Sequence, residues 1–306
     1  MADIKEFIGE DYVHSSNALF HFMSERKYLT DALKRKALCP RYCNEDVAYL
    51  NIHRDDIEFK EVAVLQKCFC DIPLRNIIKP FRVFLTENNN LTEEHMKKLP
   101  TECSHPDLYG GYAIAFSKRW GEEKHLQPIH YLSQKADCVN RFSTMINGLL
   151  LENNLPDTIS DTLLNWMCFL KPLRGTMWPA LRLKDGSEIK CEIFKNFHDE
   201  HEWRFVPFDT IVDGNPLDCL VANGAVGSGF LLSMSNKIEE ERFRDAWLQF
   251  QYDDIRYIVV PDKAARLEVI KSIRDLPEEL FSGDLLLQKA TLISKILVLD
   301  DIMKDF

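Results

Sequence analysis

The sequence predicts an α+β fold with all 306 residues in a single domain, and three observations lead to this prediction. Candidate strands and helices follow one another without the regular strand–helix alternation of a parallel α/β sheet. With 45% hydrophobic and 28% charged residues, the composition is that of an ordinary globular protein with a real core. No internal repeat is visible. A chain of this length suits one large domain with room for a helical insertion or a small second lobe.

The predicted strands are short apolar segments rich in β-branched and aromatic residues. In chain order they cover residues 18–23, 61–73, 112–120, 126–132 and 255–261. Residues 179–194 predict two strands joined at Asp185–Gly186, because an Asp-Gly pair favours a tight hairpin turn. The segment "EWRFVPFDTIV" at 202–212 is expected to continue the sheet. Residues 241–250 fit a helix and a strand equally well.

The predicted helices rest on capping residues and on the helical spacing of apolar side chains. Ser24 is placed as the N-cap of a helix within 24–38, and Pro80 stops a short helix that follows Pro73. Further helices are expected on both sides of 153–156, over 262–276 and over 285–303. Residues 39–56 are expected to form a loop with one short element inside it.

Two segments are expected to interrupt the single domain 1–306. Residues 86–107 are polar and contain Asn and Pro clusters, which predict a flexible insertion. Residues 138–175 are expected to form a helical insertion. The glycines at 224, 227 and 229 match neither a dinucleotide-binding fingerprint nor a P-loop, so a glycine-rich turn is expected there.

Charge and cysteine usage restrict the environment and the partners. A net charge of -10 and a pI near 5.4 argue against a large non-specific nucleic-acid surface. Nine cysteines without a secretory leader are typical of reduced cytosolic thiols. No apolar run approaches the roughly 18 residues that a membrane helix needs. We therefore expect a cytoplasmic protein without a membrane segment.

Known metal and nucleophile motifs are missing, and we predict no metal site. Cys68 and Cys70 form a Cys-x-Cys pair, which favours buried thiols over zinc ligands. His198 and His201 are expected to be solvated loop residues. The absence of Gly-x-Ser-x-Gly gives no support to a serine hydrolase.

Glu202 lies in the unusual stretch "NFHDEHEWRFVPF" at 196–208. In a strand, Glu202 and Arg204 share one face, while Trp203 and Phe205 share the other. On a solvent-facing edge strand, Glu202 would pair with Arg204 or a cross-strand lysine. At the mouth of a cleft, its carboxylate would instead hydrogen-bond a ribose hydroxyl and stabilise positive charge on the sugar ring. Both interpretations stay open.

Several segments in a fixed order resemble one protein family. They are "LFHFM…LTDALKRKALCPRYCNED", "CFCDIPL", "YGGYAIAFSKRWGEEKHLQPIHYL", "NFHDEHEWRFVP" and "DDIRYIVV". This pattern resembles the AbiGi family, described as the antitoxin partner in bacterial abortive phage-infection systems. The resemblance runs from about residue 18 to about residue 275, with insertions at 86–107 and around 138–175. It implies a component of bacterial antiviral defence within a toxin–antitoxin system.

A more distant resemblance is to ADP-ribosyltransferases, including the DarT-like toxins that modify DNA. Such enzymes carry a polar residue, often His, on a first strand, an aromatic residue on a middle strand and a Glu on a later strand. The matching positions are His21 in "LFHFM", Tyr112 in "YGGYAIAF" and Glu202 in "EWRF". The resemblance implies a small split β-sheet core with a helical insertion and C-terminal helices. The arginine signature of some transferases is missing around His21.

The second resemblance implies an NAD-dependent site. Glu202 would be the catalytic residue, His21 would bind the nucleotide ribose, and Tyr112 would stack on the nicotinamide. Arg204, or Arg41 beside Tyr42, would contact the pyrophosphate. His21 and Tyr112 also fit core positions. The acceptor would be nucleic acid or protein, and the acidity of the chain disfavours nucleic acid.

Two further functions stay open. A non-catalytic antitoxin or phage-sensing protein would bind a cognate toxin or a phage component, and an acidic surface would mask a basic toxin. In a nuclease or another hydrolase, Asp71, Asp199 and Glu202 would hold a divalent ion, although their spacing gives no dedicated support. The oligomeric state does not follow from the sequence.

Overall fold

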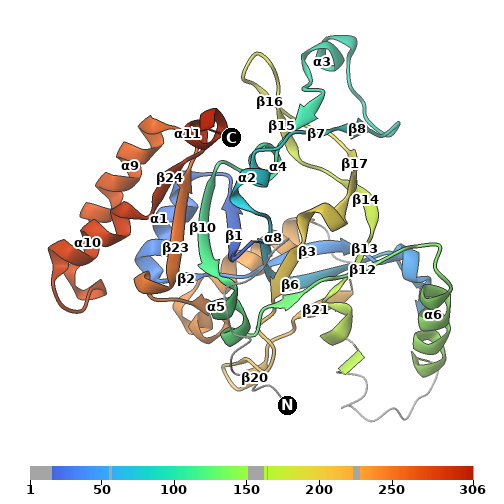
Figure 1. Cartoon of the computed structure of the whole chain (residues 1–306). Coiled ribbons are helices and arrows are strands. Elements are labelled where there is room, and N and C mark those ends of the chain that lie inside the picture. Colours follow the sequence, from blue (N-terminus) through green and yellow to red (C-terminus); the bar gives the residue numbers. More distant parts are fainter. Residues whose placement is uncertain (1–15, 55–56, 151–161, 164, 223–227, 306) are drawn as a thin grey trace, which may run out of the picture.

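A mixed β-sheet forms the centre of the protein (Figure 1). The computed structural model describes residues 16–54, 57–150, 162–163, 165–222 and 228–305. Along the sheet the order is β11-β18-β6-β1-β10-β23-β24, and β3 and β21 also pair with β6. These strands are β1 (Ala18–Met23), β3 (Arg41–Asp46), β6 (Glu61–Cys70), β10 (Tyr112–Ser117), β11 (Gln127–Pro128), β18 (Glu202–Phe205), β21 (Leu220–Ala222), β23 (Ile255–Val260) and β24 (Ile296–Val298). All pairs are antiparallel except β23 with β24, so the predicted α+β class is confirmed.

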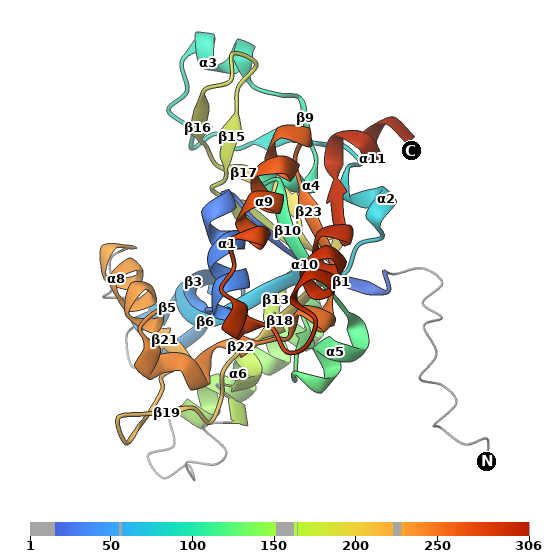
Figure 2. The ribbon, with the colours of Figure 1, turned by 90° about the vertical axis from the view of Figure 1, so that its left-hand side faces the viewer.

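Helices cover one face of this sheet. They are α1 (Arg26–Arg35), α9 (Lys263–Arg274) and α10 (Leu285–Ser294), which lie in front of the strands in Figure 2. Leu33 of α1 and Val269 of α9 are buried in one core with Phe116 of β10. Trp203 and Phe205 of β18 pack against the same core, as the alternation of side chains in "EWRF" predicts. The polar pair Glu202 and Arg204 is therefore directed to the opposite face.

The opposite face of β1, β10 and β23 carries a second, smaller core. Phe20, Ala113, Ala115 and Val259 are buried there. Two short helices contribute to it, α2 (Leu74–Ile77) through Ile77 and α11 (Leu299–Asp305) through Leu299. Within β6 this core reaches only Cys70 at the end of the strand, so Gln66 and Cys68 of β6 and Glu202 of β18 are left on the same face to line the site described below.

The remaining strands form short separate sheets. They are the three-stranded sheet of β14 (Arg174–Met177), β17 (Ile193–Asn196) and β8 (Phe84–Leu85), and the pairs β12 (His130–Leu132) with β13 (Leu170–Pro172), β15 (Ala180–Arg182) with β16 (Glu188–Lys190), β7 (Phe81–Arg82) with β9 (Glu102–Cys103), β2 (Ala37–Leu38) with β22 (Leu248–Gln249), β4 (Ile52–Arg54) with β5 (Ile57–Phe59), and β19 (Ile211–Val212) with β20 (Asn215–Pro216). The other helices are α3 (Glu93–Lys98), α4 (His105–Tyr109), α5 (Lys118–Glu123), α6 (Asp137–Leu150) and α8 (Ser228–Ile238). Within the described ranges, no helix has the length and apolar character that crossing a membrane requires.

Several elements match their sequence predictions. The strand 18–23 is β1, and α2 ends before Pro80. The hairpin of β15 and β16 turns at Asp185–Gly186, where Gly186 adopts a φ of 86° that glycine tolerates without a Cβ clash. The amphipathic helix predicted over 262–276 is α9.

Other elements differ from their predictions. Ser24 does not cap α1, because the helix begins at Arg26 with Glu25 in the N-cap position and no side-chain capping bond. Residues 39–56, predicted as a loop with one short element, contain β3, a 3-10 helix over Ala48–Leu50 and β4, and β3 pairs with β6 along its whole length. The predicted helix 285–303 is interrupted by β24, since its Ile-Leu-Val run pairs with β23.

Two more predicted segments divide into shorter elements. Residues 126–132 form two short strands, β11 and β12, and residues 241–250 contain a 3-10 helix over Glu241–Ala246 followed by β22. The helix expected before 153–156 is α6, whereas 151–161 and 164 lie outside the described residues. The two predicted insertions contain regular elements: 86–107 includes α3 and β9, and 138–175 includes most of α6 and β13.

Gly110 joins α4 to β10 in a conformation that requires glycine. Its φ is 105° and its ψ is 154°, and a Cβ there would lie 2.1 Å from the backbone oxygen of Met23. We expect Gly110→Ala to lower the free energy of unfolding by about 3 kcal/mol or more, because strain and a backbone clash add. Gly148→Ala in α6 is the control, since its Cβ meets nothing within 4 Å and alanine favours the helix by about 0.5–1 kcal/mol. Urea denaturation measures both changes, and equal stability of the two variants would contradict the argument.

Candidate functional site

The strands β1 and β6 separate after a single residue pair. Phe20 pairs with Cys70, and the ladder between the two strands ends there. Beyond this pair the His21 side chain makes the contact between the strands, with Nδ1 2.8 Å from the backbone oxygen of Cys68. A carbonyl oxygen only accepts, so Nδ1 carries the proton and donates it, which leaves Nε2 as a hydrogen-bond acceptor. The imidazole therefore bridges the two strands in a defined tautomer where their backbone ladder has ended.

A cavity of about 730 Å³ lies on the face of the sheet away from the helices. His21 of β1 and Glu202 of β18 both line it, together with Gln66, Cys68 and Cys70 from β6, the strand between them. Its volume falls in the range of about 300–1,000 Å³ that small-molecule sites occupy. Two of the three residues that the sequence grouped are thus brought to one cavity, although 181 positions separate them.

Tyr112, the third of these residues, lies elsewhere. It packs with Ile114 and Phe116 against the helix-covered core, because residues two apart in a strand share a face. Glu202 belongs to the other face, in register with Cys70 and Phe20. The aromatic residues that line the cavity are instead Phe20, Phe22, Trp178, Phe197 and Tyr109, the last at the end of α4.

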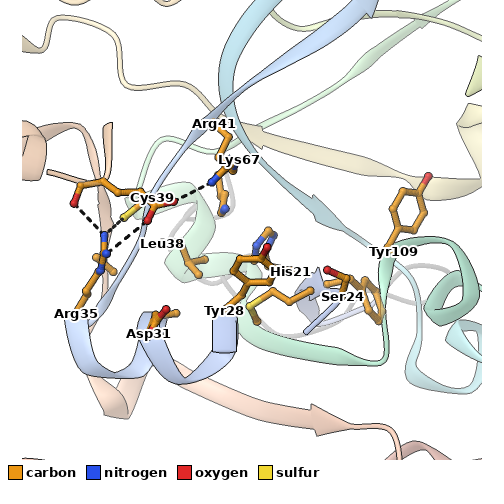
Figure 3. Close-up of a pocket in the computed structure, with 15 residues that line it drawn as sticks. His21, Ser24, Tyr28, Asp31, Arg35, Leu38, Cys39, Arg41, Lys67 and Tyr109 are labelled. Atoms are coloured by element: carbon orange, nitrogen blue, oxygen red, sulfur yellow. Dashed lines mark hydrogen bonds and ion pairs between the residues drawn. The ribbon is translucent and has the colours of Figure 1, made fainter. Parts of the chain in front are cut away.

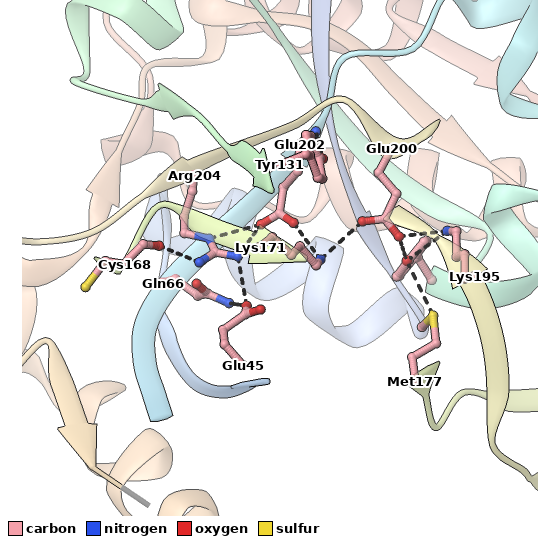
Figure 4. Close-up of polar contacts among 11 residues, drawn as sticks. Glu45, Gln66, Tyr131, Cys168, Lys171, Met177, Lys195, Glu200, Glu202 and Arg204 are labelled. Carbon is pink, nitrogen blue, oxygen red and sulfur yellow. Dashed lines mark hydrogen bonds and ion pairs between the residues drawn. The ribbon is translucent and has the colours of Figure 1, made fainter. Parts of the chain in front are cut away.

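Glu202 is buried, with both carboxylate oxygens bound to cations (Figure 4). Its Oε1 accepts from Nε and Nη2 of Arg204 at 3.0 and 2.9 Å, and its Oε2 accepts from Nζ of Lys171 at 2.8 Å. Arg204 is fully buried and also donates to Glu45 Oε1 at 2.8 Å. The expectation of a solvent-facing Glu202 is therefore wrong, while its pairing with Arg204 is confirmed.

The ion pairs continue through a second buried glutamate. Lys171 Nζ lies 3.3 Å from Glu200 Oε2, and Lys195 Nζ donates to Glu200 Oε1 at 2.7 Å. The hydroxyl of Tyr109 donates to the same oxygen. Glu45, Glu200 and Glu202 alternate in this chain with Arg204, Lys171 and Lys195, so that the charges of the network cancel. We call these six residues the charge network.

The charge network keeps both central carboxylates ionised. Burial alone would raise the pKa of Glu202, but the charges of Arg204 and Lys171 outweigh it and hold the pKa below its ordinary value. The pKa of Glu200 is lowered in the same way, since Lys171 and Lys195 outweigh the effect of burial. Burial, with a contribution from nearby Lys67, lowers the pKa of His21 to about 3. At neutral pH the cavity therefore presents carboxylates and a neutral imidazole.

The other predicted ligand residues differ in their access to the cavity. Arg204 is fully buried and occupied by Glu202 and Glu45. Tyr42 is buried in a separate core and donates its hydroxyl to the backbone oxygen of Asp218 at 2.6 Å. Arg41 lines a neighbouring cavity and pairs with Glu239 at 2.8 Å.

Sequence reasoning missed most of the charge network. Lys171, Lys195, Glu200 and Tyr109 come from different elements, and no motif links them. One signal was available, because Glu200 precedes Glu202 in a segment of bulky apolar residues, where a repeated acidic residue needs nearby cations. The positions of the lysines follow only from the pairing of β13 and β17 with their partner strands.

The described residues show no grouping of three or more His, Cys, Asp or Glu side chains suited to a metal ion. Asp71, which the nuclease interpretation groups with Glu202, is buried against Lys118 at 2.5 Å. Asp199 accepts a hydrogen bond from Asn196. Cys68 and Cys70 are free thiols, not joined in a disulfide, and both line the cavity.

The fold and the cavity define an α+β protein with a ligand-sized site beside a neutral network of buried charges. A family model described as "Putative abortive phage resistance protein AbiGi, antitoxin" matches residues 99–261. The "Abortive phage resistance protein AbiGi" of Lactococcus lactis subsp. cremoris is 30% identical over 284 residues, which cover 88% of this chain and 100% of that protein. The chain belongs to the AbiGi family, and the first resemblance is confirmed. No solved structure matches the chain significantly.

Arg204 is the residue whose loss should destabilise the network most. Arg204→Met keeps the apolar stem but leaves Glu202 and Glu45 without their shared cation, so we expect the free energy of unfolding to fall by about 3–5 kcal/mol. Arg242→Met is the control, because its ion pairs with Asp213 and Glu240 are exposed and each contributes about 0–1 kcal/mol. Urea denaturation at neutral pH separates the two, and a loss below about 1 kcal/mol for Arg204→Met would show that the pairing is dispensable.

His21 should give stability a pH dependence of its own. The unfolded chain binds a proton at His21 below its ordinary pKa of 6.5, whereas the folded protein does not until about pH 3. Acid therefore favours the unfolded state across this window, and His21 weakens the fold as the pH falls. We expect His21→Asn, which keeps a donor for the Cys68 carbonyl, to flatten the profile of melting temperature between pH 6.5 and 5. The exposed His125, changed to Asn, should leave the profile unchanged; equal profiles for both variants would refute the assignment.

Proposed function

We propose that this chain acts in bacterial abortive phage infection, as an antitoxin-type protein, and that its cavity binds NAD for ADP-ribosyl transfer. The observation that supports this proposal is that His21 and Glu202 line one cavity at the point where β1 and β6 separate. A split sheet with His on an early strand and Glu on a later one is what the resemblance to ADP-ribosyltransferases implies. The family description and the name of the lactococcal relative support the role in abortive infection.

The proposed chemistry uses the two residues in different ways. His21 donates Nδ1–H to Cys68, so its Nε2 is left to accept a hydrogen bond from a ribose hydroxyl. Glu202 is ionised and buried, so its negative charge would stabilise the positive charge that develops at C1′ of the ribose. The bond between C1′ and the nicotinamide nitrogen breaks, and a nucleophile of the acceptor forms the new bond to C1′ while releasing its proton. The acceptor is nucleic acid or protein.

The residues present fit an NAD-sized ligand in two respects. The cavity volume is adequate, and the Oε1 atom of the buried Gln66 has no hydrogen-bond partner among the described residues. In addition, Tyr109 offers an aromatic side chain inside the cavity, the role that the resemblance assigns to Tyr112. A ligand hydroxyl or amide is a suitable partner for Gln66.

One observation favours a non-catalytic antitoxin instead. Lys171 and Arg204 occupy both oxygens of Glu202, so a ribose hydroxyl gains access only if Lys171 moves. The same cations reduce the field that Glu202 exerts on a developing positive charge. In this second function the charge network holds β18 to its neighbours, and the protein acts by binding a toxin or a phage component.

Transfer of label from NAD separates the two functions. With NAD labelled in its adenylate moiety and single-stranded DNA, RNA or protein as acceptor, we expect labelled acceptor and released nicotinamide. Glu202→Gln should lower the rate by about 10²–10³-fold, because it removes the charge that stabilises the transition state. Glu123→Gln is the control, since Glu123 is exposed on α5 and pairs with Arg119.

Two results would contradict the transferase proposal or the role of Glu202 in it. Calorimetry that detects no NAD binding at about millimolar concentration would refute the transferase proposal and favour the antitoxin. Turnover that persists in a folded Glu202→Gln variant would remove Glu202 from the catalytic role. Circular dichroism of each variant establishes that it is folded.

A further inference from the structure

A second cavity of about 390 Å³ adjoins the first (Figure 3). His21, Phe22 and Tyr109 line both, so the two are neighbours across the gap between β1 and β6. The second cavity is bounded by α1, by the segment from β2 to β3 and by Lys67 of β6. Its volume lies within the range of small-molecule sites.

Basic side chains dominate one end of this second cavity. Arg41 Nη1 lies 2.8 Å from Glu239 Oε1, and Arg35 Nη2 lies 3.5 Å from Glu239 Oε2. The two guanidinium groups thus share one carboxylate, and a positive charge is left over. Figure 3 shows Lys67 beside Arg41, which adds a further positive charge at the same end.

Lys67 lacks the counter-charge that a partly buried ammonium group needs. No hydrogen bond or ion pair joins its Nζ to any residue of the described part of the chain. Burial lowers the pKa of Lys67, and the charge of Arg41 lowers it further. Asp31 is the other carboxylate of the lining, and in Figure 3 it lies on α1, away from Lys67. An uncompensated cation in a partly desolvated cavity destabilises the protein until an anion binds beside it.

We propose that this second cavity binds a phosphate-bearing ligand of nucleotide size, with Lys67 and Arg41 holding the phosphate. A guanidinium group contacts phosphate oxygens in pairs, and an ammonium group adds a point charge without fixed geometry. The rings of Tyr28 and His21 in the lining supply flat surfaces for the remainder of the ligand. This recognition requires no bond cleavage and does not depend on NAD chemistry in the first cavity.

Inorganic pyrophosphate and ADP test the proposal, because neither contains nicotinamide. Both should raise the melting temperature of the full chain in a concentration-dependent way. Lys67→Met should weaken pyrophosphate binding about tenfold or more, which corresponds to losing one charge-assisted hydrogen bond. The same variant should melt at a higher temperature than the unchanged protein without ligand, because an uncompensated cation has been removed. A merely structural lysine would not give these two opposite effects together.

Two further variants complete the experiment. Arg41→Gln, at a partly exposed position, should also weaken pyrophosphate binding. Lys263→Met on α9, far along the chain and exposed, should leave the affinity unchanged. The proposal is overturned if neither phosphate compound shifts the melting temperature at about 10 mM, or if Lys67→Met binds pyrophosphate as tightly as the unchanged protein. Binding of pyrophosphate without NAD turnover would keep this inference and refute only the transferase.

Discussion

The hydrogen-bonded ion pair of Glu202 and Arg204 is the interaction on which the edge of the central sheet depends. Arg204 is fully buried, and its guanidinium group joins Glu202 on its own strand, Glu45 on β3 and the backbone oxygen of Cys168 ahead of β13. These contacts tie together segments that lie far apart in the sequence. A buried guanidinium group is unfavourable unless its donors are satisfied, so each partner constrains where the others lie. The position of the cavity wall follows from this requirement.

The balance of the charge network bears directly on function. Three acids and three bases alternate, so removing any one leaves an uncompensated charge in a region with little water. Such a network preorganises Glu202, since the carboxylate has a fixed direction and stays ionised. It also lowers the attraction of Glu202 for a cationic transition state, because Lys171 Nζ lies 2.8 Å from its carboxylate and offsets part of its charge. A catalytic role for Glu202 therefore requires Lys171 to move away from its carboxylate, whereas a purely structural role requires Lys171 to stay in place.

Much of the fold was predictable from short-range patterns, and the failures have physical reasons. The strand 18–23 and the helix α9 follow from local periodicity and were correct. Residues 285–303 predict one helix, but the Ile-Leu-Val run at 296–298 pairs with the edge of β23, and this tertiary pairing outweighs the local preference. Residues 39–56 predict a loop with one short element, but Arg41–Asp46 forms a full strand of the central sheet because it pairs with β6, a partner that local sequence does not reveal.

The candidate site was predictable only where alternation and resemblance agreed. His21 and Glu202 come to one cavity because His21 lies at the gap between β1 and β6, whereas Tyr112 lies on β10, on the far side of β1 from that gap. A sequence pattern gives the residue types of a site. It does not give the place of each side chain relative to the cavity once the pairing of two strands, here β1 and β6, ends early. The contacts of Lys171 and Lys195 with Glu200 could not be predicted from the sequence either, because they depend on strands that share no motif.

His21 connects the two cavities. A regular ladder between β1 and β6 would bring the strands to about 4.8 Å along their length and leave no room between them. The ladder stops at Phe20, and the imidazole replaces the next backbone contact with a side-chain donor. One wall of this opening carries carboxylates balanced by cations, and the other carries cations that are not balanced. A ligand that bridges the opening would therefore meet a neutral imidazole and a charge-balanced carboxylate on one side, and cations without a full counter-charge on the other. This asymmetry fits the nucleotide-sized ligand proposed above, whose sugar is uncharged and whose phosphate is anionic.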